Sequence, residues 1–247
     1  MSVNGQQLVD PEGNGATVVP TGAQTPEKVQ RQVQQQAGIT PGSAGVGGGT
    51  VFDEPVLVVN QKAKLIEVNN EYAVYDQAGS QIGAVRQVGQ SKAKKLARVL
   101  LDVDQFMTHR LEVTDLTGRT LLRITRPAKL IKSTVIIEDA AGNEIGRIVQ
   151  QNMVGKIRFD LQAGGHSVGS LNAENWRAWD FAIQDVTGTE VARIKKTFEG
   201  IAKTMFTTAD NYVVRIHRPL QDPLRALVVA SALSVDTALK QDSRGLS

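Results

Sequence analysis

The chain has 247 residues, of which 41% are hydrophobic and 21% charged, so it contains enough apolar material to bury an ordinary core. Its net charge of +3 is nearly balanced, and an aromatic content of 4% without a dense Lys/Arg stripe argues against a nucleic-acid-binding surface. Cysteine is absent, which excludes disulfides, thiolate zinc sites, thiol catalysis and palmitoylation.

Residues 1–50 are predicted to form a disordered arm. They begin with MSVNGQQLVDPEG, which has no apolar targeting segment, and they end in the run GSAGVGGGT. Gly, Gln, Pro, Thr and Ser dominate this stretch, and such a composition cannot support a core. A short helix over Pro26–Gln36 fits the spacing of Val29 and Val33, although two valines cannot anchor a helix alone. We expect the arm to tether a protein partner, and the protein to be cytoplasmic, either soluble or peripheral at the inner membrane surface.

Short β-branched runs begin after Phe52, and the first two are PVLVVN (Pro55–Asn60) and KLIEV (Lys64–Val68). A repeat follows in which Asp stands three residues before Gly. This pair suits a hairpin turn, because Asp bonds the following backbone and Gly accepts a positive φ. A fifth, degenerate unit at Arg158–Leu171 has Gly165 in the same slot, with Gln162 replacing the aspartate. The four regular units are Tyr72–Val85, Leu111–Ile124, Val135–Ile148 and Phe181–Ile194.

Side chains alternate in character after each turn glycine. Positions four and six residues after it are apolar, often with a small residue beside a large one, and they predict an inward face. Positions three and five residues after it are mixed, and they predict a face suited to water or a membrane surface. Consecutive hairpins make a meander. The five hairpins supply ten strands, and the early run from Pro55 to Val68 and NYVVRIH (Asn211–His217) bring the total to about twelve, enough for a closed antiparallel barrel with room for a helix.

The repeat is interrupted by SKAKKLARVLLDVDQFM (Ser91–Met107), which is predicted to form an amphipathic helix. A cluster of basic residues in its first turns is typical either of a solvated helix face or of a site for anionic lipid headgroups. Trp176 is a candidate interfacial anchor, whereas Trp179 stands beside strand residues and is expected in the core. A short second helix fits Lys196–Phe206. The basic residues of the cluster are Lys92, Lys94, Lys95 and Arg98.

The last apolar run, Pro223–Lys240, predicts a helix buried on all sides. Between Arg225 and Asp236 every residue is Ala, Leu, Val or Ser, so no polar stripe exists. Asp222 supplies an N-cap and Pro223 the first helical position. A bilayer span needs about 20 consecutive apolar residues, which this run does not reach, so we expect the helix to fill the barrel. The residues expected to form its core contacts are Leu224, Leu227, Val228, Val229, Leu233 and Val235.

Three patterns that often carry chemistry are better explained by the fold. Gly165–Gly169 reads GHSVG, the nucleophile pattern of hydrolases around Ser167, but it occupies a hairpin turn instead of a strand–turn–helix. The histidines stand at no metal-ligand spacing, and Asp102 and Asp104 lack the other ligands of a calcium loop. We therefore expect no enzymatic activity, no metal and no cofactor, and hydrolysis by Ser167 is the third functional class in order of preference.

The repeat, the segments NEYAVYDQAG and NAENWRAWDF and the final helix together resemble the LURP-one-related and phospholipid scramblase family, in its bacterial scramblase-related branch. The resemblance implies a Tubby C-terminal-like barrel over residues 52–241, followed by a flexible tail at 242–247. It also implies a non-enzymatic protein that contacts phospholipid or an anionic membrane surface, and phospholipid scrambling is implied by the resemblance alone. The chain departs from animal scramblases because it lacks their cysteine cluster and their acidic calcium segment. The alternative function is a soluble protein-interaction scaffold with a disordered tether.

Overall fold

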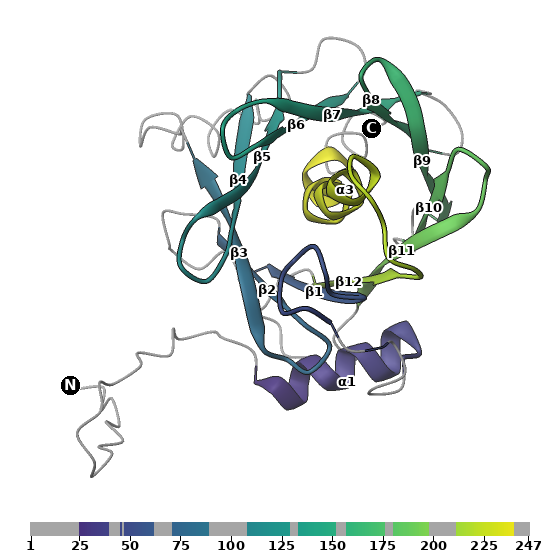
Figure 1. The fold of residues 1–247 in the computed structure, drawn as a ribbon. Helices are drawn as coiled ribbons and strands as arrows, with labels where there is room; N and C mark the ends of the chain where they lie inside the picture. The colour runs from purple at the N-terminus through teal and green to yellow at the C-terminus, as the bar shows by residue number, and fades with distance from the viewer. Residues whose placement is uncertain are drawn as a thin grey trace, which may run out of the picture.

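Twelve antiparallel strands close into one barrel around a C-terminal helix (Figure 1). The computed structural model describes residues 25–39, 45, 47–61, 71–88, 108–128, 133–151, 157–175, 180–197 and 211–239. Each strand pairs with the next one in the chain, and β1 closes the barrel against β12, which confirms the predicted meander around a buried helix. The strands are β1 (Val56–Gln61), β2 (Glu71–Tyr75), β3 (Gln81–Val88), β4 (His109–Thr114), β5 (Thr120–Arg126), β6 (Thr134–Asp139), β7 (Glu144–Gln150), β8 (Arg158–Ala163), β9 (His166–Asn175), β10 (Asp180–Asp185), β11 (Glu190–Thr197) and β12 (Asn211–Ile216).

The connections between strands divide into two groups, one at each end of the barrel. The turn end carries the short hairpin turns at residues 76–80, 115–119, 140–143, 164–165 and 186–189. Because neighbouring strands are antiparallel, the remaining connections must all start and finish at the opposite end. We call this opposite end the connection end. The strand ends found there are joined by residues 62–70, 89–108, 127–133, 151–157, 176–179 and 198–210.

In four of the turns an aspartate carboxylate organises a three-residue loop. Asp139 Oδ1 accepts hydrogen bonds from the backbone N–H groups of Ala141 and Asn143, both at 2.8 Å, and Gly142 has a φ of 91°. A turn followed by one residue with positive φ is the usual three-residue hairpin loop. The repeated aspartate and glycine therefore act as the sequence predicts. The same pair of backbone bonds is made by Asp76, Asp115 and Asp185.

The degenerate unit forms a different turn. Ala163 pairs with His166, so only Gly164 and Gly165 connect β8 to β9. Both glycines have positive φ, 58° and 81°, which is the conformation of the two-residue type I′ turn. The pairing of Ala163 with His166 closes this loop directly, so the unit forms its turn without an aspartate.

The predicted inward positions are buried in every unit. The large residues of this face have exposed fractions of 3% or less, and the small residues Gly146 and Gly169 lie where the wall approaches the central helix. At Gly146 an added Cβ would collide with the carbonyl oxygen of Gln162 and lie 3.3 Å from Cδ1 of Leu227. The large inward residues are Val85, Leu122, Ile124, Ile148, Leu171 and Ile194.

The positions three residues after each turn glycine differ from the prediction. Alternation assigns them to the outer face, yet all five pack against the main apolar cluster. A register shift occurs at each one: Ile183 pairs with Ala192 and Gln184 with Glu190, which leaves Val191 unpaired. A β-bulge of this kind inserts one extra residue and redirects its side chain. The bulge residues are Ile82, Leu121, Ile145, Val168 and Val191.

Helix α3 (Leu224–Leu239) runs through the barrel from the turn end, where β12 finishes (Figure 1). All side chains from Ala226 to Ser234 are buried, as predicted for a helix without a polar face. Its two buried serines are satisfied inside the helix, because Ser231 Oγ and Ser234 Oγ each donate a hydrogen bond of 2.7 Å to the carbonyl four residues earlier. The interior of the barrel is therefore filled by its own chain.

The start of α3 differs by one residue from the prediction. Pro223 was expected at the first helical position, but the helix begins at Leu224. The carbonyl of Pro223 accepts the first helical hydrogen bond, from the Leu227 N–H at 3.1 Å, so Pro223 flanks the helix. Asp222 does not cap the backbone; its carboxylate instead accepts a hydrogen bond from Arg225 Nη2 at 2.7 Å.

Residues before β1 contribute to the core at the turn end. Val51 is fully buried in the main cluster, and an added Cβ at Gly83 would lie 3.0 Å from its Cγ1. Phe52 packs against the same cluster, and the guanidinium of Arg225 lies 5.4 Å from the centre of its ring. The core of the barrel therefore extends one residue beyond the predicted domain start.

Part of the segment predicted as a disordered arm is a helix. Helix α1 (Pro26–Ala37) lies on the outside of the barrel beside β1, β2 and β12 (Figure 1). Val29 and Val33 are 0% and 2% exposed, and they form a second apolar cluster with outward residues of these strands. Two valines hold the helix because other residues complete the cluster: Ile39, just after the helix, and the strand residues Val56, Val58, Tyr75 and Val213.

We expect the substitution Gly146→Ala to destabilise the barrel by about 3 kcal/mol, because backbone lies in the space of the new methyl group and must shift. Ala192→Gly is the matched control, since Ala192 holds the equivalent position of another repeat unit, and it should cost about 1 kcal/mol. Urea unfolding measures both values. A Gly146→Ala variant as stable as the parent would show that β7 and β8 are less closely packed than described.

We expect Leu227→Ala to lower the free energy of unfolding by about 2–5 kcal/mol, because Leu227 is fully buried inside the barrel and its removal leaves a cavity. Leu116→Ala removes the same atoms from a turn residue that is 66% exposed, and it should change stability by less than about 0.5 kcal/mol. Similar losses in the two variants, measured by thermal unfolding, would contradict the central position of α3.

Candidate functional site

The membrane-contact residues predicted from the sequence lie outside the described residues. This applies to the whole segment Ser91–Met107 and to the tryptophans. The second predicted helix, Lys196–Phe206, starts inside β11, which extends to Thr197, and the rest of it is also outside the described residues. The predicted core residues of the final helix all belong to α3, although the side chain of Val235 is not described. The contact candidates that the structure does not place are Lys92, Lys94, Lys95, Arg98 and Trp176.

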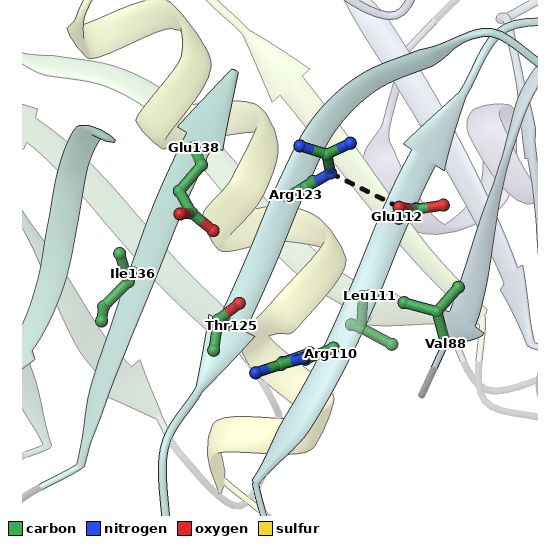
Figure 2. Close-up of a pocket in the computed structure, with 8 residues that line it drawn as sticks. All are labelled: Val88, Arg110, Leu111, Glu112, Arg123, Thr125, Ile136 and Glu138. Carbon is green, nitrogen blue, oxygen red and sulfur yellow. Dashed lines mark hydrogen bonds and ion pairs between the residues drawn. The ribbon is translucent and has the colours of Figure 1, made fainter. Parts of the chain in front are cut away.

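Because α3 fills the interior, the grooves within the described part of the chain lie on the outer wall. One groove of about 380 Å³ crosses β3, β4, β5 and β6, and we call it the β3–β6 groove (Figure 2). A second, of about 550 Å³, crosses β7 to β10, and we call it the β7–β10 groove. Both are large enough for a small polar ligand.

The register of the strands places two rows of outward side chains in the β3–β6 groove. One row runs across the four strands near the connection end, and the second lies two residues closer to the turn end. The first row contains Val88, Arg110, Thr125 and Ile136, and the second contains Glu112, Arg123 and Glu138. The groove therefore combines two arginines, two glutamates and a hydroxyl group with the apolar residues Val88, Leu111 and Ile136 in its walls.

The charges of this groove are only partly paired. Arg123 Nε lies 3.5 Å from Glu112 Oε1, and both side chains are partly exposed, so the pair contributes at most about 1 kcal/mol. Within the described residues, Arg110 and Glu138 make no hydrogen bond and no ion pair. In Figure 2, Arg110 reaches from β4 toward Thr125, and the carboxylate of Glu138 points along the groove toward the same threonine. One unpaired charge of each sign thus faces the middle of the groove.

The β7–β10 groove is polar, but its side chains bond one another. Asn172 Nδ2 donates to Ser170 Oγ at 2.9 Å and to Gln184 Oε1 at 3.2 Å. Asp160 accepts from Gln162 at 2.7 Å and from Ser167 at 2.6 Å. A ligand in this groove would have to displace these bonds, so it is the weaker of the two candidates.

Ser167, the residue of the nucleophile-like pattern, is not placed for nucleophilic catalysis. It is the second residue of β9, directly after the glycine turn, and its hydroxyl donates to a carboxylate and not to a histidine. A serine nucleophile needs a base that accepts its proton, usually an imidazole. His109 and His217 are engaged elsewhere. His109 Nδ1 lies 3.3 Å from Gln87 Nε2, and His217 Nε2 lies 2.9 Å from Glu190 Oε1. In the described ranges, no group of three or more His, Asp or Glu residues is placed to hold a metal ion.

A charged network runs along the outer wall from Glu190, at the turn end, to Asp180, at the connection end. Arg193 donates two hydrogen bonds of 2.9 Å to Glu190 and one of 2.9 Å to Asp180, and His217 also bonds Glu190. The hydrogen bonds from Arg193 lower the pKa of Glu190 from 4.5 to about 2. In the turns, the hydroxyls of Thr117 and Thr187 lower the pKa values of Asp115 and Asp185. These carboxylates stabilise the barrel itself and are not available to a ligand.

Sequence reasoning missed the β3–β6 groove. The two unpaired charges, Arg110 and Glu138, precede their turn glycines, whereas the repeat directed attention to the residues that follow them. Alternation along each strand marks both residues as outward, but it does not tell which strands lie beside one another. The meander topology provides the missing signal: hairpin register aligns Arg110 with Thr125 and Thr125 with Ile136.

The fold and its surface define a helix-filled antiparallel barrel whose grooves lie on its outer wall. The chain belongs to the Scramblase family, whose family model matches residues 50–239. This match confirms the resemblance seen in the repeat and the final helix. Among the described residues, α3 included, no helix combines the length and apolarity needed to cross a membrane.

Two individual proteins are similar to the chain. The yeast protein named altered inheritance rate of mitochondria protein 25, from Saccharomyces cerevisiae, is 23% identical, and the match covers 76% of this chain and 71% of the yeast protein. An Arabidopsis thaliana protein of known crystal structure is 13% identical to this chain, with a TM-score of 0.41. The match covers 76% of this chain and 99% of the Arabidopsis chain. The fold assignment rests on the barrel topology and not on this structural likeness.

We expect Glu190→Gln to destabilise the protein by about 2 kcal/mol at pH 7, allowing for partial solvent screening of a group that is 30% exposed. Because the folded-state pKa, about 2, lies below the ordinary value of 4.5, the stabilisation is complete above pH 4.5 and is lost as the pH falls toward 2. The difference between variant and parent should therefore shrink over this window in urea titrations at several pH values.

Glu144→Gln is the matched control, because Glu144 and Arg147 occupy the same repeat positions as Glu190 and Arg193 but are 43% and 49% exposed. It should cost less than about 1 kcal/mol at pH 7. A Glu190→Gln effect that stays constant from pH 7 to pH 2.5 would contradict the assignment of the lowered pKa to this pair.

Proposed function

We propose that this chain is a non-enzymatic phospholipid-binding protein that docks on anionic membrane surfaces by the connection end of its barrel. Membership of the Scramblase family over residues 50–239 carries the proposal. The grooves on the outer wall, outside a filled interior, are consistent with binding at a surface and not within the barrel. Movement of phospholipid between leaflets is a further activity that the family name suggests for this chain.

The topology supports the choice of the connection end. The segment that carries Lys92, Lys94, Lys95 and Arg98 joins β3 to β4, so it begins after Val88 and returns at His109, both at this end. Trp176 belongs to the connection between β9 and β10, at the same end. Basic residues near an anionic membrane contribute about 1 kcal/mol each, and tryptophan favours the headgroup layer. We propose these residues as the membrane contacts and a cytoplasmic, peripheral position at the inner membrane surface.

A protein-interaction scaffold is the alternative function. The cluster that holds α1 favours it, because an apolar patch on β1, β2 and β12 already binds one amphipathic helix. On this alternative, residues 1–50 would tether a protein partner to the barrel. The two functions differ in their need for lipid, so binding to vesicles separates them.

We expect the protein to sediment with vesicles that contain anionic phospholipid and not with vesicles of phosphatidylcholine alone, and added salt should weaken the binding. Replacing Lys92, Lys94, Lys95 and Arg98 together by Gln should reduce binding more than tenfold, given about 1 kcal/mol per residue. The matched control removes four positive charges away from the connection end: Arg31, Arg119, Arg215 and Arg218 to Gln.

The control should bind within a few fold of the parent protein. Equal and negligible sedimentation with neutral and anionic vesicles would contradict membrane docking. Equal losses in the two fourfold variants would show that net charge, and not the connection end, determines binding.

A further inference from the structure

The β3–β6 groove has a charge arrangement that matches a ligand carrying both signs. Arg110 offers guanidinium N–H donors, Glu138 a carboxylate, and Thr125 a hydroxyl group between them (Figure 2). The other two charged residues of the groove, Arg123 and Glu112, form an ion pair with each other. Arg110 and Glu138, in contrast, have no partner within the described residues. The groove thus presents one free cation and one free anion on either side of a single strand.

The spacing of these two groups fits a small zwitterion. Arg110 and Glu138 stand on β4 and β6, which β5 separates, so their backbones are about 10 Å apart across the sheet at about 4.8 Å per strand, and Glu138 also lies two residues closer to the turn end. In Figure 2 both side chains extend toward Thr125, so their charged ends converge on one part of the groove. A phosphate and an ammonium joined by two carbons carry their opposite charges only a few bonds apart, and they suit a guanidinium and a carboxylate that converge in this way.

We propose that the β3–β6 groove binds the headgroup of an amino-phospholipid, with the phosphate on Arg110 and the primary ammonium on Glu138. The inference rests on the proposed function and names the headgroup that the outer wall selects. Thr125 donates its hydroxyl hydrogen to the phosphate. A guanidinium binds phosphate through parallel N–H bonds, and these charge-assisted bonds are roughly twice as strong as neutral ones.

The chemistry of the walls favours an ethanolamine-type group over choline. A primary ammonium has three N–H donors for the Glu138 carboxylate, whereas a quaternary ammonium has none and is bound in proteins by aromatic faces. No aromatic residue lines this groove among the residues described. An uncharged headgroup such as glycerol would leave Glu138 without a cation and beside the negative phosphate.

The apolar walls point to a lipid and not to the free headgroup compound. Val88 and Ile136 flank the two ends of the row that contains Arg110 and Thr125, so the glycerol end of a phospholipid has apolar surface to cover. This row lies at the connection end, because Val88 is the last residue of β3. A headgroup in the groove would therefore belong to a lipid at the membrane surface on which the barrel docks.

The experiment is an NMR titration of the full-length protein with dihexanoyl phosphatidylethanolamine below its micelle concentration. Dihexanoyl phosphatidylglycerol, dihexanoyl phosphatidylcholine and free phosphoethanolamine serve as comparison ligands. We expect the ethanolamine lipid to shift the backbone amide signal of Thr125 and to bind at least tenfold more tightly than each comparison ligand. Arg110→Gln and Glu138→Gln should each weaken its binding at least tenfold, whereas Arg215→Gln, which changes an exposed arginine on β12, should have no effect.

Each other outcome overturns a defined part of the inference. Equal binding of the ethanolamine and glycerol lipids, or an unchanged affinity in Glu138→Gln, would remove the ammonium site. If free phosphoethanolamine bound as tightly as dihexanoyl phosphatidylethanolamine, the ligand of the groove would be the soluble compound and not the lipid. Vesicle sedimentation reports separately on docking: sedimentation with phosphatidylglycerol vesicles without headgroup selectivity would refute the groove and leave the proposed function standing. No sedimentation would refute the docking itself.

Discussion

The enclosure of α3 is the constraint on which the rest of this structure depends. A helix without a polar face has to be surrounded by protein on every side, and a closed wall of strands provides this. Small residues set the distance between wall and helix: at Gly146 and Gly169, an added Cβ would meet a helix leucine within 3.3 Å and a neighbouring strand's carbonyl closer still. Each buried Leu or Val contributes about 1.5–3 kcal/mol, so the strands cannot complete their core until the last element of the chain is in place.

Features that depend on near neighbours in the chain could be predicted from the sequence. The turn aspartates bond N–H groups two and four residues later, so the spacing of Asp and Gly alone reveals four of the five hairpins. The bulges depend on how two strands pair, and for this reason alternation placed Ile82 and Val191 on the wrong face. The docking of α1 could not be predicted either, because its apolar partners come from strands at both ends of the sequence, such as Val56 and Val213.

The difference between neighbours in the sequence and neighbours across strands also explains which candidate sites the sequence reveals. The basic cluster Lys92–Arg98 is visible in the sequence because its residues are adjacent, and the topology then assigns its connection to one end of the barrel. The β3–β6 groove is assembled from single outward residues on four strands, spread between Val88 and Glu138. On its own strand each of these is an ordinary surface residue, so only the register of the barrel brings the unpaired charges together.

The two ends of the barrel are electrostatically unequal, and this inequality bears on how it can approach a membrane. The turn end requires aspartates, because their carboxylates hold the hairpin loops, and Arg119 and Arg218 pair with two of them. An anionic surface brought to this end would meet charges of its own sign that cannot be removed without loosening the turns. The connections at the other end are free of this requirement, so basic and aromatic residues can accumulate there without a cost to the fold. The hairpin chemistry that builds the barrel is therefore compatible with the orientation that we propose for it on a lipid surface.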